Sequence, residues 1–212
     1  MKELFSIMNK PATLPAYAHP TARSTGTSLL APATMAGRVG AALLGSLFVA
    51  VCAQIAVPLP WTPVPMTMQP FAVLLVALLL GPGLGFAAMA AYLLEGAAGL
   101  PVFVPGFGGL MPLGASAGYL LSYPFVAMLV GALARHRVGF LAAAGAAAAG
   151  DCLILLSGAC WLSLFTHGSL LTAARLGILP FVGGDAIKVA LAAAAATGAA
   201  ELVKARRISR RP

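Results

Sequence analysis

Ionisable side chains inside long apolar runs are the residues of this chain with the most distinctive chemistry. Glu95, Asp151, Asp185 and Lys188 each lie within a stretch of mostly apolar residues. Inserting such a group into hydrocarbon costs roughly 2.5–3.5 kcal/mol, so it usually faces a cavity or a partner. Three acids against one lysine leave spare hydrogen-bond acceptors, which would suit a ligand that carries hydrogen-bond donors.

The spacing of these groups predicts that they lie near one another. Asp185 and Lys188 are three residues apart and therefore share one face of a helix. Counting depth at about 1.5 Å per residue places all four groups in the same, outer half of the apolar layer. Two interpretations follow: the groups pair with each other to hold the bundle together, as buried ions require, or they bind a small ligand.

A loop rich in glycine and proline, residues 96–112, adjoins this predicted cluster and contains Phe103 and Phe107. Glycine lets the backbone approach a ligand closely, and the two phenyl rings would cover its apolar part. The same composition also fits a tight connection between helices without any role in binding. Phe103 and Gly106 are our candidate ligand contacts in this loop.

The overall composition indicates that lipid covers much of the surface. Hydrophobic residues make up 60% of the 212, and only 13 residues are basic and five acidic, too few for a soluble domain of this size. The basic residues cluster in the tails and loops, which does not indicate a nucleic-acid partner. Cys52, Cys152 and Cys160 lack metal-ligand spacing. We expect them to be buried apolar residues, with no metal and no cofactor.

Hydropathy predicts an all-α integral membrane protein, because a helix needs about 20 apolar residues to span the bilayer. The predicted spans are residues 36–56, 71–80, 84–99, 113–134, 140–164 and 180–203. Gly81-Pro82-Gly83 separates the second span from the third, since a single span of about 29 residues would exceed the usual length. Five prolines within residues 57–70 predict an ordered loop rather than a helix, and residues 167–178 a short interfacial helix.

The basic residues also predict the orientation of this compact six-helix bundle. With both termini in the cytoplasm, all of the 13 basic residues except Arg175 and Lys188 lie on the inner side, as the positive-inside rule requires. Residues 36–204 then form the transmembrane domain. Residues 1–35 form a flexible cytoplasmic tail without a signal peptide, and residues 205–212 form a basic cytoplasmic tail.

Small residues recur on the first predicted span, where they would let another helix approach closely. Gly37, Ala41 and Gly45 are four residues apart, and Ala42 begins a second such row. The rows are either a docking face for a partner subunit or ordinary internal packing in an alanine-rich chain.

Four segments resemble those of the BioY family, over roughly residues 36–204. The proline-rich run PLPWTPVPMTMQ, residues 58–69, resembles the segment after the first helix of BioY proteins. The run YLLEGAAGLPVF, residues 92–103, is similar to their third-helix motif. Gly118-Tyr119-Leu120 resembles a further element, and PFVGGDAIK, residues 180–188, is similar to the start of their sixth helix.

This resemblance implies the biotin-binding S component of an energy-coupling factor (ECF) transporter in the bacterial inner membrane. Such a subunit has six helices with a vitamin pocket near the outer face, and it works with a transmembrane coupling (T) protein and a pair of cytoplasmic ABC-type ATPases. Family members carry an Asp and a Lys three apart on the last helix that contact biotin. These fall on Asp185 and Lys188.

The chemistry of biotin suggests roles for the remaining candidates. Asp185 or Asp151 would accept the ureido N–H bonds, and Lys188 would donate to the carbonyl or balance the acids. Tyr119, loop amides or Arg175 would meet the biotin carboxylate. The small residues of the first span, Gly37, Ala41, Ala42 and Gly45, would contact the coupling subunit.

Two other classes of function remain open. A proton-coupled secondary carrier for biotin or a related vitamin would use Glu95, Asp151 and Asp185 as titrating groups. A membrane enzyme is less favoured, because no nucleophile-elbow or metal motif surrounds Ser157 or His167. The sequence also lacks a P-loop. We therefore expect a transporter subunit without its own ATPase site, not an enzyme.

Overall fold

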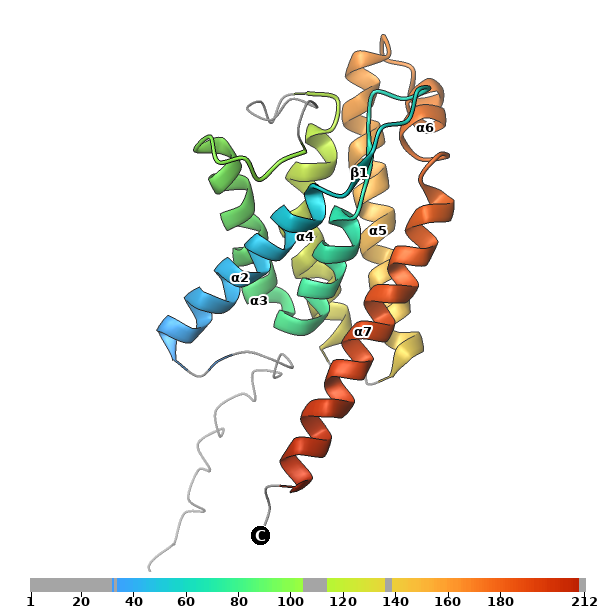
Figure 1. Ribbon diagram of the computed structural model, residues 1–212. Helices are drawn as coiled ribbons and strands as arrows, with labels where there is room; N and C mark the ends of the chain where they lie inside the picture. The colour runs from blue at the N-terminus through green and yellow to red at the C-terminus, as the bar shows by residue number, and fades with distance from the viewer. Residues whose placement is uncertain (1–31, 33, 105–113, 136–138, 210–212) are drawn as a thin grey trace, which may run out of the picture.

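The computed structural model describes residue 32 and residues 34–104, 114–135 and 139–209, which are almost entirely helical (Figure 1). The elements in chain order are α2 (Met35–Ala53), β1 (Ala56–Val57), β2 (Met66–Thr67), α3 (Gln69–Ala97), α4 (Ala117–Ala134), α5 (Phe140–Leu162), η1 (Ser163–Phe165), α6 (Leu170–Gly177) and α7 (Val182–Ser209).

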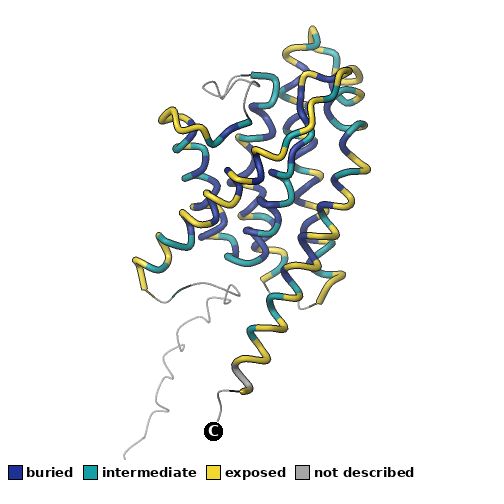
Figure 2. The backbone as a smooth tube through the Cα atoms, in the orientation of Figure 1, coloured by how far each residue is buried: buried dark blue, intermediate teal, exposed yellow. Residues whose placement is uncertain are grey.

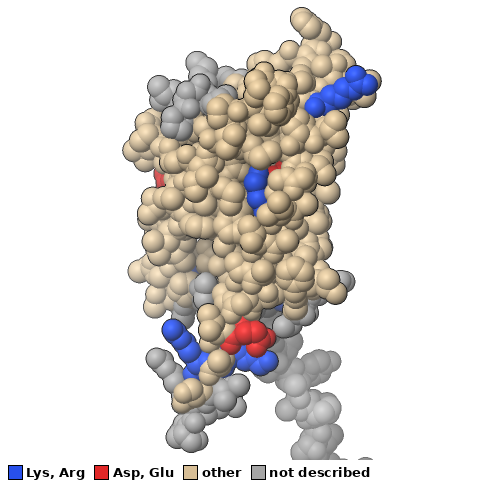
Figure 3. Space-filling model, turned by 45° about the vertical axis from the view of Figure 1, so that its right-hand side comes forward, with Lys and Arg blue, Asp and Glu red and all other residues tan. Residues whose placement is uncertain are grey.

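Five of these helices are long and apolar enough to cross a membrane: α2, α3, α4, α5 with η1, and α7. Large apolar side chains such as Leu44, Leu141 and Leu191 are exposed on their outer faces. Figure 3 shows charged side chains gathered at the lower end of the molecule and a basic side chain at the upper end, while the surface between them is mostly uncharged, with a small blue and red patch and a red spot at one edge. An apolar belt with charges beyond it is the surface of a multi-pass membrane protein.

Helix α3 reverses direction at Gly81, where φ is 75° and ψ is −177°. Gln69 Nε2 donates a hydrogen bond of 2.7 Å to the Tyr92 hydroxyl, although these residues would lie about 34 Å apart in a straight helix. Residues 69–80 and 82–97 therefore run as two antiparallel limbs, visible in Figure 1. The predicted turn at Gly81-Pro82-Gly83 coincides with this reversal.

Glycines let the neighbouring helices close in on α3. A Cβ at Gly131 of α4 would lie 2.5 Å from Pro82 N and 2.6 Å from Gly81 C. A Cβ at Gly150 of α5 would overlap the Val130 side chain of α4 and lie 3.1 Å from Leu74 of α3. The dark blue residues of Figure 2 mark the resulting core between α3, α4 and α5, whereas the C-terminal half of α7 is mostly exposed.

The small residues of α2 also pack inward. Ala42 and Gly45 are buried, and a Cβ at Gly45 would lie 3.1 Å from both Ala88 and Val76 of α3. This contact favours internal packing for these two positions. Gly37 and Ala41 are only partly buried. The exposed face of α2 instead carries Val39, Leu43, Leu44, Leu47, Phe48 and Val51.

The proline-rich segment after α2 contains a short β-ribbon that the sequence did not predict. Ala56 pairs with Thr67 and Val57 with Met66 in antiparallel register; strands of two residues are too short to show an alternating pattern. Helix α3 then begins at Gln69, earlier than expected, with Pro70 in its first turn. A proline is tolerated there because its missing N–H would have no helical partner.

Several other predicted features differ in detail from the structure. Helix α7 extends to Ser209, beyond the expected end at residue 203, and α6 is shorter than the predicted interfacial helix. Cys152 and Cys160 are exposed, so the expectation that all three cysteines are buried is wrong for these two. Helix α5 is so rich in alanine that hydrophobic periodicity does not reveal its buried face.

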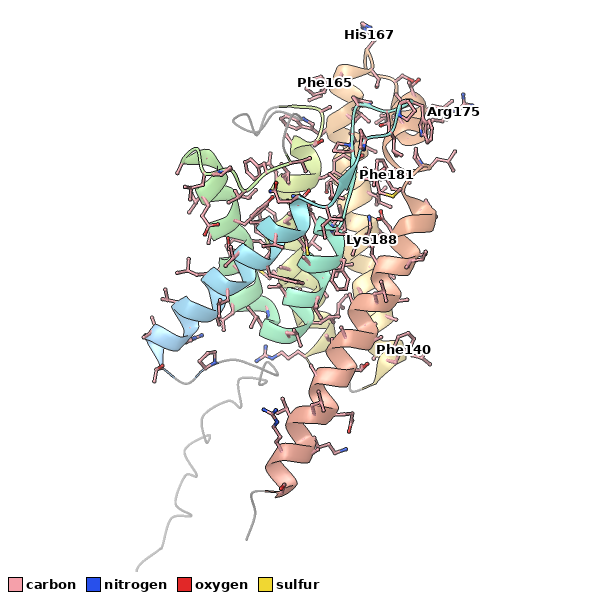
Figure 4. The ribbon with its side chains drawn as sticks, in the orientation of Figure 1. Phe140, Phe165, His167, Arg175, Phe181 and Lys188 are labelled. Atoms are coloured by element: carbon pink, nitrogen blue, oxygen red, sulfur yellow. The ribbon has the colours of Figure 1, made fainter. Side chains whose placement is uncertain are left out.

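The ends of the elements define two poles of the bundle. Helix α2 begins, and α7 ends, toward the lower pole of Figure 1, whereas the β-ribbon and α6 lie at the upper pole. Lys204 and Arg206 near the end of α7 are exposed, and Figure 4 places Arg175 of α6 at the upper pole.

Replacing Gly81 tests the reversal of α3. Gly81→Ala should destabilise the protein by about 1–3 kcal/mol, because its φ and ψ are adopted almost only by glycine. Gly83→Ala is the matched control: a Cβ there has nothing within 4 Å, and alanine favours a helix. Thermal unfolding of both variants in detergent measures the difference. Equal stability of the two variants would contradict the reversal.

Candidate ligand-binding site

A cavity lies between the helices near the upper pole. The empty space of about 740 Å³ includes its open mouth. Its walls come from β2 and the residues around it, the start of α3, residues 103–104, the first turns of α4, the middle of α5 and the start of α7. Most lining side chains are apolar, with a few polar groups among them.

The strongest polar feature of this cavity is an ion pair on α7. Lys188 Nζ lies 2.7 Å from Asp185 Oδ1, and the side chains of Lys188 and Asp185 are only 7% and 3% exposed. Both residues line the cavity, and Figure 4 shows Lys188 below Phe181 near the start of the helix. Asp185 lies in the first turn of α7, where a negative charge is favoured by the helix dipole.

Asp151 of α5 lies below the cavity rather than in its wall. It is 7% exposed, and its Oδ1 has no hydrogen-bond partner among the described residues. It is close enough to Asp185 and Lys188 to interact electrostatically with both. The next turn of α5 supplies Ile154 and Leu155 to the cavity wall.

Glu95 lies apart from these three charged residues. Its carboxylate accepts a hydrogen bond from the Ser46 hydroxyl of α2, and it does not line the cavity. The sequence placed Glu95 at a similar depth, but depth does not reveal which face of α3 carries it. The structure therefore brings together three of the four predicted groups.

Two tyrosines of α4 line the cavity one turn apart, Tyr119 and Tyr123. The Tyr119 hydroxyl donates a 2.7 Å hydrogen bond to the Gly177 carbonyl of α6, and a Cβ at Gly158 would overlap the Tyr119 ring. Because its hydrogen is already donated, Tyr119 has none left for a ligand carboxylate. The sequence analysis missed Tyr123, although its i+4 spacing from Tyr119 places it on the same helix face.

Phe103 lines the cavity, as the glycine-rich loop suggested. Its ring meets Tyr92 edge to face, with centroids 5.3 Å apart, and a Cβ at Gly96 would overlap it. Gly106, the other loop candidate, lies outside the described residues. Arg175 is exposed on α6 and does not line the cavity.

A buried hydrogen-bond network forms a wall that the sequence analysis also missed. Gln69 accepts from the Thr67 hydroxyl at 3.0 Å and donates to Tyr92, whose hydroxyl donates to the Val102 carbonyl at 3.0 Å. Gln69 and Thr67 line the cavity. The sequence feature that could have indicated this network is the amide side chain of Gln69, which lies between a proline-rich segment and an apolar run. Phe181, just before α7, is a further lining residue that was not singled out.

Comparison with known proteins relates this architecture to vitamin transporters. The model of the BioY family matches residues 24–205. A probable biotin transporter BioY from Pyrococcus horikoshii is 40% identical over 153 residues, which cover 70% of this chain and 89% of that protein. Biotin transporter BioY from Thermotoga maritima is 38% identical over 138 residues, covering 65% and 81%.

A solved structure has the same fold. The crystal structure of the S-component for biotin from an ECF-type ABC transporter aligns with a TM-score of 0.70 and 25% identity, covering 85% of this chain and 96% of that one. The family match extends over most of the chain and includes every helix that lines the cavity. This chain therefore belongs to the BioY family.

Proposed function

We propose that this chain binds biotin with high affinity and takes it up as the S component of an ECF transporter. The observation that carries the proposal is the Asp185–Lys188 ion pair, buried in the wall of a largely apolar cavity. The relatives named as biotin transporters and the structural similarity to a biotin S-component support biotin as the ligand.

The ion pair offers both kinds of hydrogen bond that the ureido ring of biotin needs. Asp185 uses Oδ1 for Lys188, and its other oxygen would accept a ureido N–H. Lys188 has three N–H donors, one of which points to Asp185, so another would donate to the ureido carbonyl. Hydrogen bonds to charged groups contribute roughly 1.5–3 kcal/mol each.

The apolar part of biotin fits the aromatic walls. Phe103, Tyr119 and Phe181 line the cavity and would contact the thioether ring. We assign Tyr119 to this wall rather than to the biotin carboxylate, since its hydrogen is donated to Gly177. The carboxylate would take its hydrogen bonds from other donors near the mouth.

The proposed topology has six transmembrane helices, with both termini in the cytoplasm and the cavity facing the outside of the bacterial inner membrane. Counting the two limbs of α3 separately gives six spans. Helix α2 begins and α7 ends at the pole where charged side chains gather, as the positive-inside rule favours for a cytoplasmic face (Figures 1 and 3). The cavity lies toward the opposite pole.

Uptake would require partners: a transmembrane coupling (T) protein and cytoplasmic ABC-type ATPases, which supply the ATP hydrolysis. The sequence of this chain has no P-loop. We propose that α2 contacts the coupling protein through its exposed side next to Gly37 and Ala41. Ala42 and Gly45 would act indirectly, since they set how closely α2 packs on α3.

Calorimetric titration of the detergent-purified chain tests the proposed ligand. We expect one-to-one binding of biotin, because the cavity wall offers an acceptor and a donor side by side for its ureido ring, and no binding of the control vitamins riboflavin and thiamine. A folded, monodisperse sample that fails to bind biotin would contradict the proposal. Uptake by liposomes that hold this chain alone, driven by a pH gradient, would instead favour a proton-coupled carrier.

Substitution of the ion pair tests the proposed contacts. Asp185→Asn and Lys188→Ala should each weaken biotin binding by about 10- to 150-fold, the equivalent of one charged hydrogen bond. Lys204→Ala is a matched control, because Lys204 pairs with Glu201 on the same helix at the same i, i+3 spacing but is exposed. Unchanged biotin affinity in both ion-pair variants, measured by the same titration, would refute this role.

A further inference from the structure

Asp151 is a buried acid that forms no ion pair with any described residue. Its side chain belongs to α5 at the level just below the cavity, it is 7% exposed, and its Oδ1 has no partner in the described part of the chain. An ionised carboxylate in such a site would lose its hydration without receiving hydrogen bonds in return. Burying an unpaired charge costs several kcal/mol, so buried acids commonly keep a proton instead.

The groups around Asp151 do not supply the missing positive charge. From α7, Asp185 and Lys188 act on it, but Lys188 is already bound to Asp185 at 2.7 Å. From α4, Tyr123 lies within electrostatic reach and is a neutral phenol. The polar groups of α3 interact elsewhere: Tyr92 is hydrogen-bonded to Gln69, and Glu95, which lies apart from this cluster, to Ser46. Two acids thus share one cation in this region of the described structure.

We propose that Asp151 is a proton-binding site beneath the ligand cavity, which holds its proton at neutral pH and whose deprotonation weakens biotin binding. The second part of this proposal rests on the proposed function, whereas the first part does not. Asp151 would then be a positioning residue that acts through the ion pair. It differs from a hydrogen-bond acceptor for biotin, because it does not line the cavity.

The direction of the pH effect follows from the charges. When Asp151 is neutral, the ammonium group of Lys188 interacts with Asp185 and with the ligand. Once Asp151 ionises, it attracts Lys188 away from Asp185 and adds a negative charge close to a ligand that carries its own carboxylate. Biotin affinity is therefore full at the lower pH, where Asp151 is protonated, and it falls as the pH rises through the titration of Asp151.

Infrared spectroscopy of the full-length, ligand-free protein in detergent tests the first part. We expect a carbonyl band of a protonated carboxyl group at about pH 7. The band should be missing in Asp151→Asn, remain in Glu95→Gln, and disappear in the wild type as the pH is raised. A wild-type protein without such a band at about pH 7, or a band that Asp151→Asn leaves in place, would overturn the proposal.

Biotin titration at a series of pH values tests the second part. The wild-type affinity should fall by up to about tenfold per pH unit once Asp151 begins to lose its proton. In Asp151→Asn, which has no proton to lose, the ratio of the affinities at about pH 7 and about pH 9.5 should be close to one. The same alkaline loss in both proteins would overturn the link to binding.

The two measurements separate this inference from the proposed function. If biotin does not bind at any pH, the proposed function fails, and the infrared band still decides whether Asp151 carries a proton. If biotin binds but the band is absent, the proton site is wrong and the proposed function stands.

Discussion

The cost of burying charge inside a membrane protein governs the architecture around the cavity. Asp185 and Lys188 meet this cost by pairing at 2.7 Å on one helix face, and the pair places a donor and an acceptor side by side in an apolar wall. Aromatic rings line the same cavity, and apolar surroundings strengthen electrostatic interactions. Asp151 has no comparable partner among the described residues, and we propose that it meets the same cost by keeping a proton.

Close helix packing is the second constraint, and it places these charges. Gly81 allows α3 to reverse, and Gly131 allows the backbone of α4 to contact that reversal. The same packing sets α3 and α5 beside α7, and Tyr119, Tyr123 and Leu155 line one cavity with Asp185. Gly158 and Gly177 leave room for Tyr119, whose hydrogen bond ties α4 to α6. Small residues inside the bundle are therefore part of the construction of the site.

Much of this architecture could be predicted from the sequence, because apolar length and glycine-proline turns are local signals. Examples are the helices from residue 35 onward, the break at Gly81 and the spacing of Asp185 and Lys188. The direction in which each helical side chain points was harder to predict. Glu95 points to Ser46 rather than to the cavity, and Ala42 and Gly45 pack on α3. Helices with apolar residues on every side give no periodic signal for their inner face. Gln69, Tyr123 and Phe181 were missed because only tertiary packing brings them to one wall.

Biotin binding at the buried Asp185–Lys188 ion pair is the central prediction for this protein. An experimental structure of the chain with biotin bound tests it most directly. We predict that the ureido ring lies within hydrogen-bond distance of both Asp185 and Lys188, with the thioether ring against Phe103, Tyr119 and Phe181. Biotin found away from α7, for example beside Glu95 and Ser46, would contradict the account.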